Sequence, residues 1–472
     1  MQRHILIIGG GISGLSAAYF LLKKRPTLRV TVLEAGEYWG GKIRTERVDG
    51  FVIEGGPDCF LASKPQAAAL CRELGLGDTL QGTNPRQRST YILRNGQLQP
   101  IPAGLVSMIP TDFKSIVTTR LMSWPQKARM ALDLAIPART AGEEESVGGF
   151  VSRRLGRGAY DNLIQPLIAG IYTGDGDALS LDATFPALRE MEQQHGGLIR
   201  GALARRKQSL ASGESGPHSR ATFLTPRDGL AALPEALVAS LQKSGAEMYL
   251  NSAVERINKF GDGFIVEMEN SGPMEVDGLV LATPANVSAK LLAAHYPELA
   301  SALESIPLAS TATVSLAYLL ADLPQALNGY GYVIPRREQR PALACTWTSS
   351  KFDHRAPDGY ALIRVFVGRA GEKLPARDEE ILALACTELA ETMGIKVLPT
   401  LTRIFRWEDA MPQYNLGHQV RVARIEAEVA KYSRLALGGN IYKGVGIPDC
   451  IRSGELAAEK LLAAYNNKTE PN

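Results

Sequence analysis

The amino-acid sequence predicts an α/β fold in which a Rossmann-like dinucleotide-binding domain is assembled from distant segments. Three observations predict it. A strand, a glycine-rich turn and a helix open the chain, and a second set of the same three elements closes it. The residues between them are first largely helical and then rich in strands. They predict an inserted helical domain and a substrate domain with a mixed or antiparallel sheet.

Length and charge exclude several classes of protein. A chain of 472 residues is long enough for two large or three ordinary domains. Its 52 basic and 49 acidic residues give a formal net charge of +3, which is too balanced to indicate a nucleic-acid partner. A hydrophobic content of 45% with 21% charged residues is typical of a folded globular protein.

The distribution of cysteine and apolar residues predicts a cytoplasmic location. The five cysteines have no C-x-x-C spacing, which favours unpaired thiols in a reducing compartment. A strand begins by His4, which leaves no room for a signal peptide, and no run of eighteen apolar residues could span a bilayer. The six histidines are isolated from one another, so we expect no metal site.

The first glycine-rich turn predicts a pyrophosphate site. Residues 5–8 form an apolar run suited to a buried parallel strand, and residues 15–24 have helical composition. The glycines between them follow the G-x-G-x-x-G spacing, which permits a tight turn and a close approach of the backbone to phosphate. The helix N-terminus offers free N–H groups to the same anion. The predicted binding residues are Gly9, Gly10, Gly11, Ile12, Ser13 and Gly14.

An acidic residue at the end of the second strand predicts the ribose contact. The strand over residues 30–33 ends at Glu34, twenty positions after Gly14. A carboxylate at this place can accept hydrogen bonds from the ribose hydroxyls of an adenosine. Next come Gly40 and Gly41, then Lys42 and Arg44, either of which can meet a phosphate or remain a solvated cation. These features do not distinguish NAD from FAD.

The middle of the chain supplies the other two predicted domains. Asn95-Gly96 predicts a hairpin over residues 89–101, and residues 102–191 have helical periodicity. The stretch 194–220 predicts a loop. Beyond it we expect a strand over 248–257, a hairpin across 261–263, a strand over 277–284 that returns to the nucleotide, strands over 311–319, 343–348 and 361–367, and a helix over 379–393.

A set of apolar residues in the helical stretch has two interpretations. They can form a core stripe, which is the default, or a face directed at a membrane or a substrate entrance. The residues are Leu121, Met122, Trp124, Met130, Leu132 and Leu134.

The closing glycine-rich segment favours FAD. The strand that begins at Leu435 meets glycines by Asn440, and residues 444–450 open a helix over 451–464. Its donors suit the pyrimidine carbonyls and ribityl chain of a flavin. A nicotinamide-binding domain normally finishes within one contiguous unit, so a cofactor held by both chain ends indicates FAD. The predicted domains are 1–84, 223–285 and 430–472 for FAD, 85–101 and 286–429 for substrate, and 102–222 for the helical domain.

Several motifs then indicate a family. Besides the nucleotide-binding residues, they are Glu54 to Asp58, Gly170 to Asp175 with Leu179-Ser180, Ala282-Thr283-Pro284, Ala410 to Tyr414 with Gly417-His418, and Gly438 to Cys450. On these motifs the chain resembles the FAD-dependent amine oxidase superfamily and, within it, the protoporphyrinogen/coproporphyrinogen oxidase family. The likeness runs from end to end. Because no transit peptide or membrane span is predicted, the chain is similar to the soluble bacterial branch of this family. The usual substrate of that branch is coproporphyrinogen III, which is oxidised to coproporphyrin III.

The resemblance implies cofactor contacts. Besides the pyrophosphate turn, it assigns Glu34 and Ala35 to the adenosine ribose and Val254 to the adenine side. It implies no catalytic residue, because hydride passes directly to flavin N5 and the electrons then go to dioxygen with release of hydrogen peroxide. The residues implied near the ribityl chain and isoalloxazine are Lys42, Gly56, Pro57, Asp58, Cys59, Trp407, Val445, Gly446 and Ile447.

The resemblance also implies a flat apolar slot for a tetrapyrrole, lined by Leu167, Ile168, Ile171 and Tyr172. The membrane-bound branch commonly has an arginine where this chain has Asp58, so the partner of a substrate carboxylate must come from elsewhere. Lys64 is one candidate, with an exposed lysine at a helix start as the equal alternative. Peripheral contact with a membrane and transient docking with a ferrochelatase are further expectations.

Three alternatives remain open at this point. The substrate can be protoporphyrinogen IX, which has fewer propionates. The chain can instead be a flavin amine oxidase, in which Tyr332, Tyr414 or Lys443 lies near the flavin. It can also be a binding protein in which FAD is structural.

Overall fold

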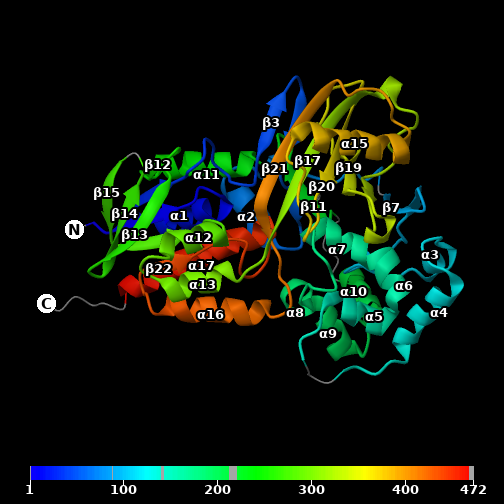
Figure 1. The fold of residues 1–472 in the computed structure, drawn as a ribbon, viewed down its shortest axis with the longest axis horizontal. Helices are drawn as coiled ribbons and strands as arrows, with labels where there is room; N and C mark the ends of the chain where they lie inside the picture. Colours follow the sequence, from blue (N-terminus) through cyan, green and yellow to red (C-terminus); the bar gives the residue numbers. More distant parts are fainter. Residues whose placement is uncertain (1, 88, 140–142, 212–220, 270, 467–472) are drawn as a thin grey trace.

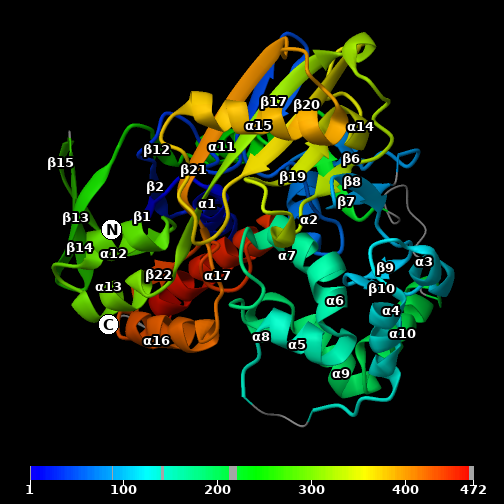
Figure 2. The same cartoon turned by 45° about the vertical axis from the view of Figure 1, so that its right-hand side comes forward.

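A computed structural model describes residues 2–87, 89–139, 143–211, 221–269 and 271–466. Figure 1 shows a nucleotide-binding unit on the left, a large sheet at the upper right and a helical unit below it, and Figure 2 shows the same three parts after a turn of 45°. The predicted α/β class is confirmed. Within the described residues, no helix is long and apolar enough to cross a membrane.

The nucleotide-binding unit is built on a five-stranded parallel sheet in the order β12-β2-β1-β16-β22. Strands from both ends and the middle of the chain therefore lie side by side, which confirms a sheet assembled from distant segments. The strands are β1 (His4–Ile8), β2 (Arg29–Leu33), β12 (Glu247–Tyr249), β16 (Gly278–Leu281) and β22 (Leu435–Leu437).

Both faces of this sheet are buried, as the continuous apolar run in β1 predicts. Ile5 and Ile7 belong to one core with α1 (Ile12–Lys24) and α17 (Ile447–Asn466), whereas Leu6 and Ile8 belong to another. The alternation follows from the two-residue period of a strand. On the first face α2 (Pro65–Glu73) and α11 (Ala232–Lys243) also pack, and on the second lie α12 (Ala285–Leu292), α13 (Pro297–Glu304) and α16 (His418–Ala430).

The large sheet has seven strands in the order β21-β17-β20-β19-β18-β7-β8. Only the β7–β18 pair is parallel, so the predicted mixed sheet is confirmed. Asn95 and Gly96 both have positive φ, 50° and 73°, as the predicted hairpin turn requires. The strands are β7 (Thr90–Arg94), β8 (Gln97–Pro100), β17 (Leu308–Leu319), β18 (Gly331–Val333), β19 (Ala342–Trp347), β20 (Tyr360–Val367) and β21 (Leu401–Pro412), and α15 (Asp378–Met393) packs against them.

The helical unit corrects one prediction. Residues 198–211, expected as a loop, form α10, because Leu198, Gly201 and Ala202 are buried and anchor the helix. Residues 212–220 of the same prediction lie outside the described residues. The other helices are α3 (Phe113–Thr118), α4 (Trp124–Ala131), α5 (Val147–Leu155), α6 (Arg157–Ala159), α7 (Gln165–Tyr172), α8 (Leu181–Thr184) and α9 (Pro186–His195), with a 3₁₀ turn, η2 (Leu132–Leu134), and a π-helical segment, η3 (Tyr160–Ile164).

A second prediction was wrong for residues 248–257. They form two strands in different sheets, β12 and β13 (Val254–Phe260), because the backbone turns at Asn251, whose φ is 51°. The hairpin across 261–263 is confirmed by the pairing of β13 with β14. The smaller sheets are β3 (Thr45–Val48) with β4 (Phe51–Glu54), β5 (Phe60–Leu61) with β11 (Phe223–Pro226) and β6 (Leu80–Gly82), β13 with β14 (Gly263–Met268) and β15 (Ser271–Val276), and β9 (Leu105–Val106) with β10 (Ile109–Pro110).

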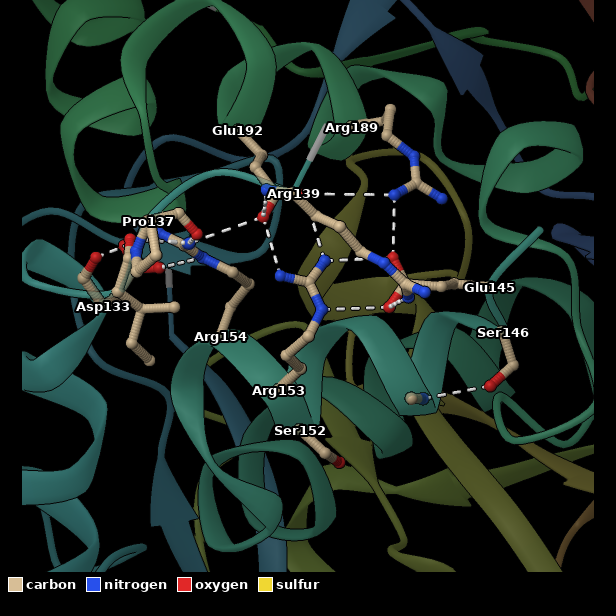
Figure 3. A network of polar contacts seen from close by, with 12 residues as sticks. Asp133, Pro137, Arg139, Glu145, Ser146, Ser152, Arg153, Arg154, Arg189 and Glu192 are labelled. Atoms are coloured by element: carbon tan, nitrogen blue, oxygen red, sulfur yellow. Dashed lines mark hydrogen bonds and ion pairs between the residues drawn. The ribbon is translucent and has the colours of Figure 1, made fainter. Parts of the chain in front are cut away.

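A buried polar network holds the helical unit together (Figure 3). Arg154 on α5 is fully buried, and its Nε donates to the carboxylate of Asp133 at 2.6 Å. Its other N–H groups donate to backbone carbonyls, including that of Gly196 at 2.9 Å. The adjacent Arg153 donates to Glu192 on α9 at 2.7 Å. The paired charges therefore fix α5 to α9 and to η2.

Candidate active site

The adenosine end of the site is organised by Glu34 at the end of β2. Its carboxylate accepts the backbone N–H of Gly10 at 2.7 Å and that of Gly36 at 2.8 Å. The Ser252 N–H donates to the backbone carbonyl of Glu34 at 2.9 Å, which brings the segment leading to Val254 beside the strand end. Ala35 next to it is exposed. The structure therefore brings together the three residues predicted for the ribose and adenine.

The glycine turn between β1 and α1 has a different constraint at each position. Gly9 has a φ of +107°, and a Cβ at Gly14 would lie 1.9 Å from the carbonyl oxygen of Gly9. At Gly11, by contrast, the nearest protein atom would be 4.0 Å from a Cβ. Helix α1 starts at Ile12, and no side chain caps its first turn. Open space at Gly11 beside uncapped N–H groups fits a pyrophosphate.

The closing glycine loop meets this turn. A Cβ at Gly438 would lie 3.9 Å from Cβ of Ser13, and a Cβ at Gly454 of α17 would lie 2.2 Å from the Ser13 carbonyl oxygen. Helices α1 and α17 therefore pack closely. Gly439 has a φ of +139° with open space around its α-carbon. The predicted residues Val445, Gly446 and Ile447 lead into α17 from this loop.

The turn after β4 lies against Lys42 and Trp407. A Cβ at Gly56 would lie 2.0 Å from the Lys42 carbonyl oxygen and 3.7 Å from the Trp407 ring, and the Trp407 indole donates to the Gly55 carbonyl at 2.8 Å. Burial lowers the pKa of Lys42. In the described part of the chain no carboxylate lies within 4.0 Å of the Lys42 ammonium. A polar or anionic group of a bound cofactor would compensate the buried charge of the Lys42 ammonium.

Asp58 is held by two cations that sequence reasoning missed. Its carboxylate lies 2.8 Å from Lys351 Nζ and 3.7 Å from an Arg364 nitrogen, and the Cys59 thiol donates to it at 3.0 Å. Burial by itself would raise the pKa of Asp58, but Lys351 and Arg364 hold it well below its usual range. The cations that pair with this carboxylate come from α14 (Thr348–Lys351) and β20, which are far from Asp58 in the sequence. The sequence around Asp58 therefore does not indicate that Lys351 and Arg364 are its partners.

Helix α7 divides the predicted slot residues between two faces. Ile171 is 46% exposed and Leu167 is half-buried, and these two lie one helical turn apart. Ile168 and Tyr172 are 0% and 5% exposed, packed in the core of the helical unit, where Tyr172 contacts Phe185 edge to face. Of the four predicted slot residues, the structure therefore places Leu167 and Ile171, and not Ile168 or Tyr172, on the accessible face of α7.

Comparison with known proteins identifies the family. Residues 12–462 match the model of the flavin containing amine oxidoreductases. The chain belongs to this family. It is a flavin-dependent oxidoreductase, and FAD is its cofactor.

Its relatives include porphyrinogen oxidases. It is 36% identical to the coproporphyrinogen III oxidase of Bacillus subtilis, with 98% of each chain covered. It is 30% identical to the protoporphyrinogen oxidase of Bos taurus over the full length of both. The crystal structure of a candidate protoporphyrinogen oxidase from Exiguobacterium matches with a TM-score of 0.86 and 34% identity, covering 99% of each chain.

Of the residues considered for an amine oxidase site, Tyr332 lies away from the glycine loops, and Lys443 belongs to the closing glycine loop but has an exposed side chain. Tyr332 is buried in the large-sheet core, and its hydroxyl donates to Glu388 at 3.1 Å. Lys443 is exposed and pairs with Glu426 at 2.6 Å. Tyr414, which follows β21, contacts this loop, and its hydroxyl donates to the Asn440 carbonyl. Lys64 pairs with Asp449 at 2.6 Å and is 44% exposed.

Proposed function

We propose that this oxidoreductase converts coproporphyrinogen III into coproporphyrin III in heme biosynthesis. The observation that carries the proposal is the end-to-end similarity, at 36% identity, to a bacterial enzyme of that name. The coproporphyrinogen III oxidase of Staphylococcus aureus, at 35% identity, supports the same substrate. Protoporphyrinogen IX is the second candidate, favoured by the 30% identity to the bovine enzyme.

In this proposal the protein binds and orients the substrate. Bound FAD supplies the redox chemistry, accepting hydride from a bridging carbon of the macrocycle and passing the electrons to dioxygen as hydrogen peroxide. The glycine turns, Lys42, the Gly55–Cys59 turn and Trp407 would hold the cofactor. Leu167 and Ile171 on α7 would offer an apolar surface to the macrocycle. Formation of an aromatic product favours the reaction, so no strong general base is required.

Substrate carboxylates need cations at the edge of the slot. Lys64 supports such a role because it is partly exposed. Its ammonium is held by Asp449, which also accepts the Gly446 N–H at 3.3 Å. Lys64 therefore joins the start of α17 to the start of α2, and a propionate would have to share its ammonium with Asp449.

The decisive experiment compares substrates. Purified FAD-loaded protein is supplied with coproporphyrinogen III or protoporphyrinogen IX, prepared anaerobically, and kcat/KM is measured from porphyrin fluorescence. We expect a preference for coproporphyrinogen III. A strong preference for protoporphyrinogen IX would overturn the assigned substrate. Amine-dependent peroxide release without porphyrin fluorescence would instead establish an amine oxidase.

We propose further that the helical unit contacts a membrane surface. Both views place α3 and α4 at its outer edge (Figures 1 and 2). Leu121, Met122 and Met130 are buried, but Phe113 and Trp124 are 79% and 67% exposed. Leu132 and Leu134 are also exposed. An apolar surface beside the cations Lys114, Arg120 and Lys127 suits an anionic lipid surface.

The cellular setting is part of the same proposal. All five cysteines are unpaired, which supports a reducing, cytoplasmic compartment. Docking with a ferrochelatase stays a prediction, as do the domain bounds given above.

A further inference from the structure

Tyr414 lies at the point where the three units of the chain meet. It follows β21 and is fully buried. Its hydroxyl donates to the Asn440 carbonyl at 2.6 Å and accepts the Gly444 N–H at 3.0 Å. One hydroxyl therefore joins two backbone groups four residues apart in the loop between β22 and α17.

His418 holds the same loop at a third point. Its ring is stacked on Tyr414, with centroids 3.9 Å apart and planes 14° apart. Its Nε2 lies 3.0 Å from the Tyr442 carbonyl oxygen, and because a carbonyl only accepts, Nε2 carries the hydrogen. The stacked pair thus fixes alternate residues of the loop, 440, 442 and 444.

The other side of Tyr414 faces the helical unit. Its ring centroid is 6.0 Å from that of Tyr172 at the end of α7, and its carbonyl accepts the Ser180 N–H at 2.8 Å. The neighbouring Gln413 donates to the Tyr172 carbonyl at 2.9 Å. Tyr414 therefore connects the loop to the helix that carries Leu167 and Ile171.

Besides this pair, the loop is held by the Gly439 N–H bond to Ser453 Oγ at 3.0 Å and by the buried side chain of Ile441. Gly439 and Gly444 have φ values of +139° and +112°, and neither lies in a helix or strand. Gly439 has no protein atom within 4 Å of an added Cβ, so its backbone is open to a ligand. The glycines add conformational freedom and no side-chain contacts of their own, so hydrogen bonds from partners help to set the shape of the loop.

We propose that Tyr414 and His418 are positioning residues that hold the loop from Asn440 to Gly446 in its FAD-binding conformation and connect it to α7. The proposal rests on FAD binding and not on the identity of the substrate. Neither residue has to touch the reacting atoms.

The test is FAD binding to the full chain after Tyr414→Phe, which keeps the stacked ring and removes the hydroxyl. Loss of the two hydrogen bonds that hold the loop should raise the FAD dissociation constant about tenfold. The visible spectrum of the bound flavin should also shift, because its surroundings at the loop change. Tyr330→Phe is the matched control, since it removes a hydroxyl bonded to the Asn84 carbonyl at 2.9 Å, away from the loop.

His418→Phe keeps an aromatic ring on Tyr414 and removes the bond to Tyr442. We expect it to weaken FAD binding and to show coupling with Tyr414→Phe in a double-mutant cycle. This second variant tests the proposal even where Tyr414→Phe does not fold. Unchanged dissociation constants and flavin spectra in folded variants would overturn it, as would an equal loss in Tyr330→Phe.

Discussion

The carboxylate of Glu34 accepts the backbone N–H of Gly10 at 2.7 Å, and it thereby joins the end of β2 to the glycine turn after β1. The same side chain accepts the Gly36 N–H. One carboxylate thus shapes the backbone around the ribose position and remains able to accept further hydrogen bonds through its free lone pairs.

Glu34→Gln should weaken FAD binding. The change removes the charge from hydrogen bonds that are each worth about 1.5–3 kcal/mol, so we expect the dissociation constant to rise roughly 10- to 100-fold. Titration of FAD into the apoprotein, followed by quenching of flavin fluorescence, measures it. Glu37→Gln is the control, because Glu37 is exposed three residues away. Equal affinity in the two variants would show that Glu34 does not bind the ribose.

Alanine at Gly11 and at Gly14 should have opposite consequences. Gly14→Ala places a Cβ 1.9 Å from the Gly9 carbonyl oxygen, so it should destabilise the apoprotein by about 1–3 kcal/mol or more. Gly11→Ala meets no protein atom closer than 4.0 Å, so the apoprotein should unfold at the same temperature while FAD binds poorly. Thermal unfolding with and without FAD separates the two. Normal FAD binding by the Gly11→Ala variant would show that the pyrophosphate does not bind next to Gly11.

Arg154→Met should open the helical unit. It leaves Asp133 and Glu192 buried without one of their partners, which costs about 3–5 kcal/mol in comparable sites. Urea unfolding and proteolysis within residues 113–211 measure the loss. Arg157→Met is the control, because Arg157 is 57% exposed in its pair with Asp161 and should contribute less than about 1 kcal/mol. Similar losses in both variants would contradict a structural role for the buried network.

Protonation of Glu192 at low pH should weaken the buried network of the helical unit. Burial alone would raise the pKa of Glu192, but the hydrogen bond and charge of Arg153 outweigh it, so its pKa lies below the ordinary 4.5. A depressed carboxylate stabilises the fold above its unfolded pKa and loses that contribution as pH falls through the folded value. The free energy of unfolding should therefore decrease as the pH is lowered below 4.5. Glu192→Gln should reduce the pH dependence of this free energy by up to about one bound proton. Glu190→Gln, on the exposed side of α9, is the control, and an equal reduction of the pH dependence in that variant would contradict the role of Glu192.

The parts of the site that the sequence predicted are those set by local geometry. The turn from Gly9 to Gly14 and the acid at Glu34 lie within one βαβ segment, where spacing alone determines their positions. The closing loop could be predicted for the same reason, because it repeats the strand-to-helix turn.

Other features depend on residues far apart in the chain and had no local signal. Asp58 meets Lys351 across 293 positions, so sequence reasoning found an unexplained departure and not an ion pair. Helix α10 was missed because its basic, glycine-containing sequence resembles a loop, whereas burial of Leu198, Gly201 and Ala202 against the helical unit anchors it. On α7 the sequence indicated the slot residues but not which of them are accessible, because the neighbouring helices determine which face of α7 is buried.

The exposed apolar residues of α3 and α4 should bind anionic lipid. Phe113→Ser combined with Trp124→Ser removes the two most exposed aromatic side chains of this surface, so co-sedimentation with vesicles of anionic phospholipid should fall several-fold while porphyrinogen oxidation in solution is retained. Leu398→Ser is the control, because Leu398 is 87% exposed in the loop between α15 and β21 of the large-sheet unit. Added salt should weaken binding of the unaltered protein, since Lys114, Arg120 and Lys127 would supply the attraction to the lipid. Vesicle binding equal in both variants, or absent from the unaltered protein, would refute a membrane role for this surface.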